Sequence, residues 1–167
     1  LSRMSAAGSR WANAALIGST LRGADLTGAT LTGVNLAGAN LVTAVLSSAK
    51  ASGVDVSNGT LYGALGVAAD LSKASLSDAT LSMADFTDAN LSRSDLSRVK
   101  AKGVTIAGAD LTRAKAKNAS LTSVSAAGAT MTRMLLKGAD LSSGDITDAS
   151  AKQLDLDGAN LSGTLFA

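Results

Sequence analysis

Residues 24–43 read ADLTGATLTGVNLAGANLVT and contain the same five-residue unit four times in succession. Each unit has a small residue first, a leucine third, and polar or small residues at the other positions. A period of five matches neither the 3.6 residues of an α-helical turn nor the two-residue alternation of a half-buried strand. Repeats of fixed period are typical of solenoids, in which each unit stacks on its neighbours to bury a continuous core.

The five-residue period continues through nearly the whole chain. Every fifth position from Leu16 to Phe166 is Leu, Ile, Val, Met or Phe, except at Ala51, Gly66, Ala101, Ala116, Ala126 and Ala151. Two positions before each member of this large series lies a small one: Ala, Val, Gly, Ser or Thr everywhere except at Met134 and Leu154. We expect both series to point inward, because only a small side chain fits beside a large one at native packing density.

The unit resembles the A-(D/N)-L-x-x repeat of the pentapeptide-repeat family, as in Ala24-Asp25-Leu26 and Ala109-Asp110-Leu111. The resemblance covers residues 19 to 166 and implies an all-β fold, a right-handed quadrilateral parallel β-helix with four units to each 20-residue coil. About seven to eight coils, stacked at ~4.8 Å, would then make one solenoid domain over residues 18–167.

Residues 1–17 are expected to form a separate N-terminal cap. A helical spacing of three and four is kept by Leu1, Met4, Gly8, Trp11 and Ala15, although Leu1, Ala6, Trp11 and Leu16 also keep the five-residue phase. A solenoid needs its terminal coil covered, because an open core and bare edges invite aggregation. The sequence therefore predicts a short helical or irregular cap, with Trp11 over the first coil.

The composition argues against an enzyme. The chain has no cysteine, histidine or glutamate, so a site would have to be built from Asp, Ser, Thr, Lys and Tyr. Nine of the 13 acidic residues occupy the slot before the large apolar residue: Asp25, Asp55, Asp70, Asp85, Asp95, Asp110, Asp140, Asp145 and Asp155. Identical slots on a convex rod do not give two carboxylates the different environments that acid–base catalysis needs. We therefore predict no catalytic residue, no cofactor and no metal.

One candidate contact surface is basic. Residues 20 apart become vertical neighbours in a four-sided coil, which places Lys73, Arg93, Arg113 and Arg133 in a ladder along one corner. Residues 93–117 add Arg98, Lys100, Lys102, Lys115 and Lys117. This surface is interpreted either as a solvated face or as a contact for an anionic partner. Nucleic acid is not expected, because the aromatic residues that stack on bases are missing here.

A second candidate surface is apolar. Five apolar residues occupy slots that should face outward: Val42, Val45, Tyr62, Leu65 and Val67. Clustered exposed apolar residues usually mark an interface, which favours a docking patch. The alternative is a local bulge at residues 62–68, beside Gly66, that turns some of these side chains inward.

Together these features predict a non-catalytic scaffold or accessory protein that binds a protein partner or larger assembly through its flat faces. End-to-end self-association through the C-terminal coil is a further candidate contact. No run of 18 or more apolar residues exists, so no transmembrane segment is predicted.

The resemblance also implies one alternative function, and regularly placed threonines on a flat solenoid suggest another. Some family members mimic DNA and protect DNA gyrase, but they are strongly acidic outside, whereas this chain carries a net charge of +2. Ice binding would use Thr30, Thr32, Thr130 and Thr132, but other residues interrupt that array. The family is abundant in cyanobacteria and in the thylakoid lumen. With a start at Leu1, this is compatible with a processed protein of the lumen or another soluble compartment, the cytoplasm being the alternative.

Overall fold

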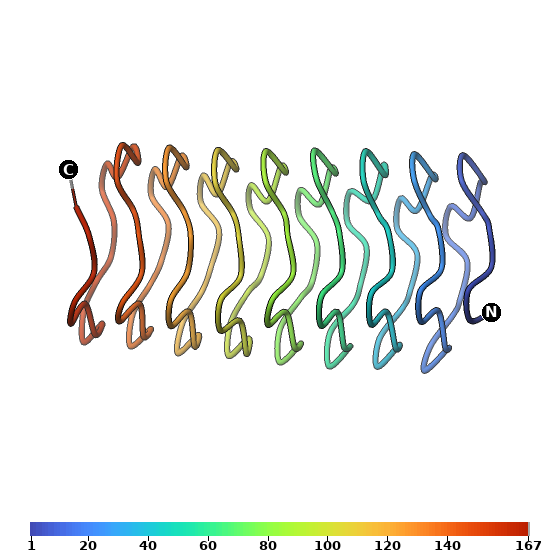
Figure 1. Ribbon diagram of the computed structural model, residues 1–167, viewed down its shortest axis with the longest axis horizontal. Coiled ribbons are helices and arrows are strands. Elements are labelled where there is room, and N and C mark those ends of the chain that lie inside the picture. The colour runs from blue at the N-terminus through green and yellow to red at the C-terminus, as the bar shows by residue number, and fades with distance from the viewer. Residues whose placement is uncertain (167) are drawn as a thin grey trace.

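The computed structural model describes residues 1–166 and shows one straight, right-handed β-helix with its two ends at opposite ends of a rod (Figure 1). These residues contain no helix and no continuous strand; the backbone pairs instead through single-residue parallel bridges. The bridges run from Ser5–Asp25 to Asp145–Leu165, and each joins a residue to the one 20 positions later. The predicted four-sided coil, with four units to each turn of the solenoid, is therefore confirmed. Since the described residues form no helix, they include no helical segment that could span a membrane.

Residues 1–17 form the first coil of the same solenoid, so the helical cap expected there is wrong. Ser5 pairs with Asp25, and the amides of Ala6 and Trp11 donate to Asp25 O and Thr30 O, each at 2.8 Å. The neighbouring coil thus supplies hydrogen-bond acceptors that a short isolated helix would have to supply itself at an unfavourable nucleation cost. The β-helix accordingly begins before the expected boundary at residue 18, and Ala167 lies outside the described residues.

The unit 24–28 shows how each backbone amide finds an acceptor. Asp25 N donates to Met4 O in the preceding coil at 2.9 Å, and Leu26 N and Gly28 N donate to the following coil at 2.7 and 2.9 Å. Ala24 N closes the preceding turn onto Leu21 O at 3.0 Å. The remaining amide, that of Thr27, donates to the carboxylate of Asp25 at 3.0 Å. No amide of the unit is left without a partner, as burial in a folded chain requires.

The core contains the two predicted residue series. From residue 21 to residue 146 every member of the large series is buried, and from residue 24 to residue 144 every member of the small series is buried. The side chains stack one above another because each coil repeats the orientation of the last. The largest fully buried side chain is that of Phe86, in the middle of the stack.

Gly66 is explained by this phenylalanine. A Cβ built on Gly66 would lie 2.4 Å from Cδ1 of Phe86, so the ring one coil above occupies the space that a leucine would fill. Leu65 still pairs with Val45 and Asp85, and Gly66 N donates to Asp85 O at 2.7 Å. The bulge considered for residues 62–68 is therefore absent, and this alternative is wrong.

Each corner of the coil is a β-turn whose third residue has a positive φ. The values lie between 54° and 68°, at fourteen glycines and at nineteen other residues. A positive φ at this position with an ordinary residue before it corresponds to a type II turn. The side chain at the third position projects from the rod, so a corner can carry a long residue wherever the backbone strain is accepted.

A buried charge should disrupt the stack. Leu91 is 2% exposed, so we expect Leu91→Ala to lower the free energy of unfolding by about 2–5 kcal/mol and Leu91→Asp to abolish the cooperative transition. The matched control is Ser123→Asp at an exposed corner, where Asp tolerates positive φ and the change should be about 0.5 kcal/mol or less. Thermal and denaturant unfolding measure both, and equal effects would contradict the inward and outward assignment.

Gly66 and Phe86 should behave as a coupled pair. We expect Gly66→Leu to destabilise the protein by about 1–3 kcal/mol through overpacking against the Phe86 ring. Adding Phe86→Leu should recover most of that loss, because a leucine above a leucine is the arrangement of Leu26 and Leu46 in the same column. A double-mutant cycle measures the coupling, and additive effects would show that the two residues do not share one space.

Candidate functional site

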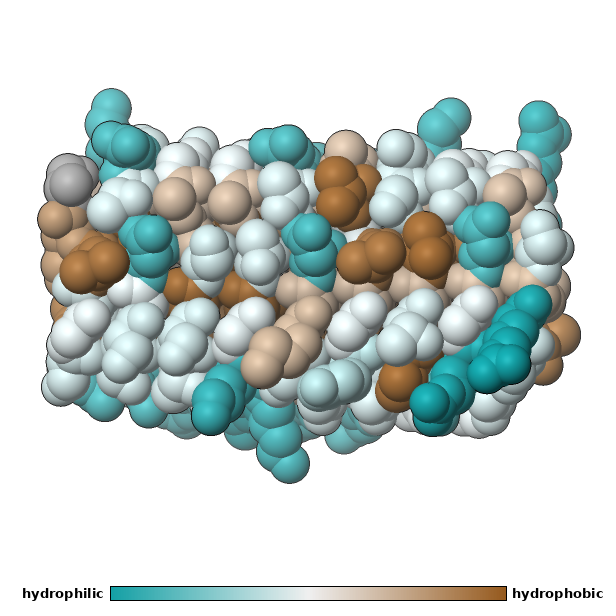
Figure 2. All heavy atoms as spheres, viewed as in Figure 1, coloured by the Kyte–Doolittle hydropathy of each residue, from teal (hydrophilic) through white to brown (hydrophobic). Residues whose placement is uncertain are grey.

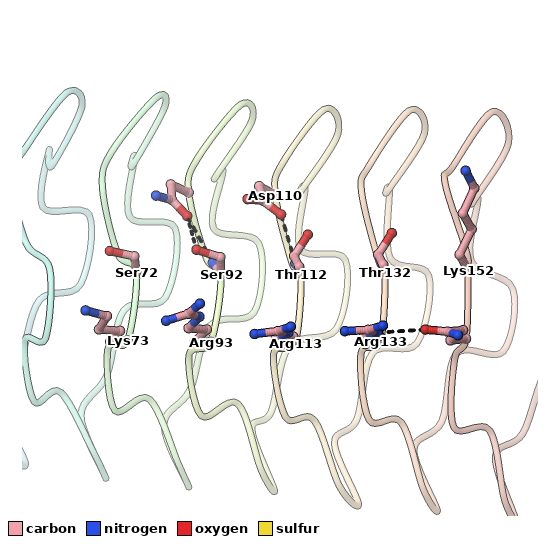
Figure 3. A pocket seen from close by; sticks show the side chains of 12 residues that line it. Ser72, Lys73, Ser92, Arg93, Asp110, Thr112, Arg113, Thr132, Arg133 and Lys152 are labelled. Carbon is pink, nitrogen blue, oxygen red and sulfur yellow. Dashed lines mark hydrogen bonds between the residues drawn. The ribbon is translucent and has the colours of Figure 1, made fainter.

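A basic groove runs along one corner of the rod. Figure 3 shows Lys73, Arg93, Arg113 and Arg133 in one row, as the sequence predicts. Each is the third residue of the β-turn at the same corner of four successive coils. A parallel row beside it contains Ser72, Ser92, Thr112, Thr132 and Lys152. With Asn90, Asp110 and Gln153, these residues line an open hollow of about 810 Å³. We call these twelve residues the basic groove.

The groove carries five cations and one carboxylate. Within residues 1–166 the ion pairs are Arg98–Asp78 at 2.6 Å and Lys137–Asp157 at 2.5 Å, both outside the groove. Asp110 accepts a hydrogen bond from its own turn, from Thr112 N at 2.8 Å, and Arg133 Nε donates to Gln153 Oε1 at 2.7 Å. The groove therefore presents a row of like charges without an ion-pair partner among the described residues.

The cation row is held in place by backbone that favours glycine. The φ values of Lys73, Arg93, Arg113 and Arg133 are 58°, 60°, 60° and 58°. An ordinary side chain is strained there by roughly 1–2 kcal/mol, and glycine is not. The same column has Gly33 and Gly53 in two earlier coils. From residue 73 to residue 153, however, this corner has a long side chain in every coil.

The other predicted basic residues are distributed over neighbouring sides of the rod. Arg98 is neutralised by Asp78, whose two oxygens accept from Nε and Nη2 at 2.8 and 2.6 Å. The hydrogen bond from Arg98 holds the pKa of the Asp78 carboxyl below its usual value. Lys115 lies on the face next to the groove, where its backbone forms β-bridges with Asp95 and Leu135. Lys117 lies at the following corner.

Lys100 and Lys102 lie farther around the coil, on the face that follows the face of Lys115 and at the corner after it. Lys100 pairs with Thr80 and Ser120 on its face, and Lys102 occupies the corner after it. Neither residue lines the groove. The structure therefore brings together the predicted ladder and leaves the remaining cations as separate charges.

Lys152 was missed by the sequence reasoning, which considered the hydroxyl residues of this face only as an interrupted array for ice binding. Lys152 lies one coil after Thr132, and Thr132 lies one coil after Thr112. The spacing that identified the cation ladder would have extended this second row to Lys152, and shown it beside the ladder, if it had been applied to the residue before each cation. It could not show that the two rows border a hollow, which depends on the turn geometry.

The aspartates before the large residues are structural elements of the turns. Each of the nine accepts a hydrogen bond through Oδ1 from the amide two residues later, at 2.8 to 3.2 Å. Hydrogen bonds of this kind lower the pKa of Asp25, through the Thr27 hydroxyl and amide, and of Asp145, through the Thr147 amide and hydroxyl. The described residues contain no cluster of three potential metal ligands. These carboxylates therefore cap the backbone of their own turns.

The apolar patch consists of Val42, Val45, Tyr62, Leu65 and Val67, and all five side chains point outward. Figure 2 shows apolar side chains gathered in the middle of one long face, with hydrophilic ones on both sides. Tyr62 is 49% exposed and Leu65 is 44% exposed, while the three valines are half-buried. Its role as a docking surface stays a prediction.

A second hollow lies at the C-terminal coil. It has a volume of about 410 Å³ and is lined mainly by apolar residues, including Leu154, Leu156, Leu161 and Phe166. This coil leaves part of the core accessible, because no further coil lies on it among the described residues. Self-association through it stays a prediction.

Comparison with known proteins agrees with this architecture. The family model described as pentapeptide repeats matches residues 1–33, 24–63, 69–106, 106–142 and 127–163, with eight copies. No curated protein matches the chain at a significant level.

Solved structures similar to this one include trypsin-treated QnrB1, a plasmid-mediated fluoroquinolone resistance protein. It is 20% identical over 98% of this chain and 83% of its own, with a TM-score of 0.87. HetL, a pentapeptide repeat protein involved in heterocyst differentiation regulation in the cyanobacterium Nostoc sp. strain PCC 7120, is 29% identical over 98% and 85%, with a TM-score of 0.41. A pentapeptide repeat protein from the Arabidopsis thaliana thylakoid lumen is 29% identical over 68% and 66%, with a TM-score of 0.38. At this identity the first likeness shows the fold alone.

The outward direction of the patch can be tested by stability. We expect Tyr62→Ser with Leu65→Ser to lower the free energy of unfolding by about 1 kcal/mol or less, because both side chains are already in contact with water. Leu61→Ser is the matched control, since Leu61 is 1% exposed and its loss should cost about 3 kcal/mol or more. If the surface pair unfolds the protein as readily as the control, these side chains contribute to the core.

Proposed function

Because the chain belongs to the pentapeptide-repeat family, we propose that it is a non-catalytic scaffold or accessory protein that binds an anionic protein partner through the basic groove. Proteins of this family are generally structural or binding proteins. A rigid rod with regular faces is suited to this role, because a partner can dock without reordering it.

One observation supports the groove as the contact: a row of cations without ion pairs among the described residues. Lys73, Arg93, Arg113 and Arg133 are all exposed, and their side chains project from neighbouring coils. Elsewhere on the rod, Arg98 shows that a carboxylate one coil away pairs readily with a corner arginine. The groove lacks such carboxylates, so its charges repel one another until an anion from outside the chain approaches. Complementary charge favours association and orients the partner.

The two alternative functions receive less support. A DNA mimic that binds DNA gyrase would need an acidic surface, whereas the groove has five cations against one carboxylate. The likeness to QnrB1 shows the fold alone and gives no evidence for a binding partner of this chain. Ice binding needs a flat array of hydroxyls, but the surface beside Thr112 and Thr132 is hollowed and bordered by charges.

Charge reversal tests the proposal. We expect Arg93→Glu with Arg113→Glu to weaken the complex with the co-purifying native partner by about tenfold or more at low salt, and by less at high salt, because screening reduces charge attraction. The matched control is Lys100→Glu with Lys102→Glu, which changes the net charge equally on a different side of the rod. Affinities measured at two salt concentrations separate the cases. Equal weakening by the two pairs would assign the effect to overall charge and reject the groove.

A further inference from the structure

We infer that the basic groove takes an extended acidic peptide segment, lying parallel to the solenoid axis. This inference rests on the proposed function and specifies the form of the partner. It depends on the length of the cation row, on the donors beside it, and on the lack of aromatic side chains in the groove.

The length of the row fits a short strand. Successive coils are ~4.8 Å apart, so Lys73 to Arg133 spans about 14 Å along a straight line. An extended chain rises about 3.3 Å per residue and presents alternate side chains on one side. Three acidic residues at alternate positions therefore span about 13 Å, nearly the length of the four-cation row. When the three carboxylates are centred on the row, the outer two lie beside Lys73 and Arg133, and the middle one lies between Arg93 and Arg113.

The second row of the groove offers donors to the peptide backbone. At Thr112 the amide is occupied by the Asp110 carboxylate, as in other units. In the next two coils Thr130 and Ser150 replace the aspartate, and within residues 1–166 the amides of Thr132 and Lys152 have no acceptor. Two free N–H groups beside a row of cations suit a ligand that combines carboxylates with carbonyl oxygens. An acidic peptide has both groups.

Other anions fit this arrangement less well. Proteins that bind single-stranded nucleic acid stack bases on aromatic side chains, and none of the twelve groove residues is aromatic. Asp110 on the groove wall would also oppose a continuous row of phosphates, whereas a peptide can place a neutral residue opposite it.

The ion pair of Arg98 and Asp78 shows how a carboxylate can contact a corner arginine of this rod. There a carboxylate one coil from a corner arginine accepts two hydrogen bonds, at 2.8 and 2.6 Å. Arg98 has φ 57° and Arg113 has φ 60°, so the two side chains leave the backbone in the same way. The corner position one coil before Arg93 or Arg113 holds a cation, Lys73 or Arg93, so a carboxylate that makes the same contact with either arginine has to come from outside the chain. Arginine is suited to this contact because its planar group binds carboxylates through two parallel hydrogen bonds.

The test uses two labelled nine-residue peptides of equal composition, titrated at low salt and followed by fluorescence anisotropy. In the first, four aspartates alternate with five glycines; in the second, the four aspartates are contiguous. We expect the alternating peptide to bind more tightly, and Arg93→Gln with Arg113→Gln to weaken it by about tenfold. Lys100→Gln with Lys102→Gln should leave its affinity unchanged. Equal affinity of the two peptides, or equal loss in the two variants, would overturn the inference.

A nine-nucleotide oligothymidylate serves as the competing probe. If it binds more tightly than the alternating peptide and loses affinity in the groove variant, the groove belongs to nucleic acid and the inference is wrong. If neither peptide binds, but charge reversal still weakens the native complex, the extended-peptide inference fails while the proposed function stands. If charge reversal leaves the native complex intact, the proposed function itself fails.

Discussion

The constraint on which the whole structure depends is that each residue pairs with the residue 20 positions later. Amides at positions such as Asp25 and Leu26 bond to the coil before and the coil after, so one insertion or deletion would misalign every later coil. The same pairing stacks large side chains on large ones and small on small. Backbone hydrogen bonding and core packing therefore require one register, which explains why the five-residue phase is kept from end to end.

Because of this regularity, outward positions repeat at fixed spacing along the rod, and binding residues can be introduced there. A substitution at an outward slot changes one point of a fixed grid without altering the core, since the nine turn aspartates and the Leu and Ala series hold the coil. The basic groove arises in this way, from long side chains at one corner of successive coils. The positive φ of Arg93 and Arg113 costs free energy. The burial of Leu91 and Leu111 in the same turns offsets this cost.

The apolar patch and the groove are separated on the rod, so they can serve different contacts. Val45 and Leu65 lie on one face between Asp25 and Asp85 along the column, whereas the groove follows a corner between two other faces. A scaffold gains from such separation, because two partners could be bound on different sides of the rod at the same time. This arrangement is consistent with the proposed binding role and needs no chemistry from the chain.

The sequence by itself determined the period, the inward series and the cation ladder, because each depends on spacing alone once residues 20 apart are neighbours. It could not decide whether residues 1–17 form a helix or a coil, since Trp11 fits both spacings and only the hydrogen bond to Thr30 O selects one. It left Gly66 open as well, because the phenylalanine that fills its space is one coil away. Only the tertiary structure showed that Asp78 neutralises Arg98, and that Lys152 and the hydroxyl row border a hollow with the ladder. These features depend on how side chains leave the turns, which a one-dimensional pattern does not specify.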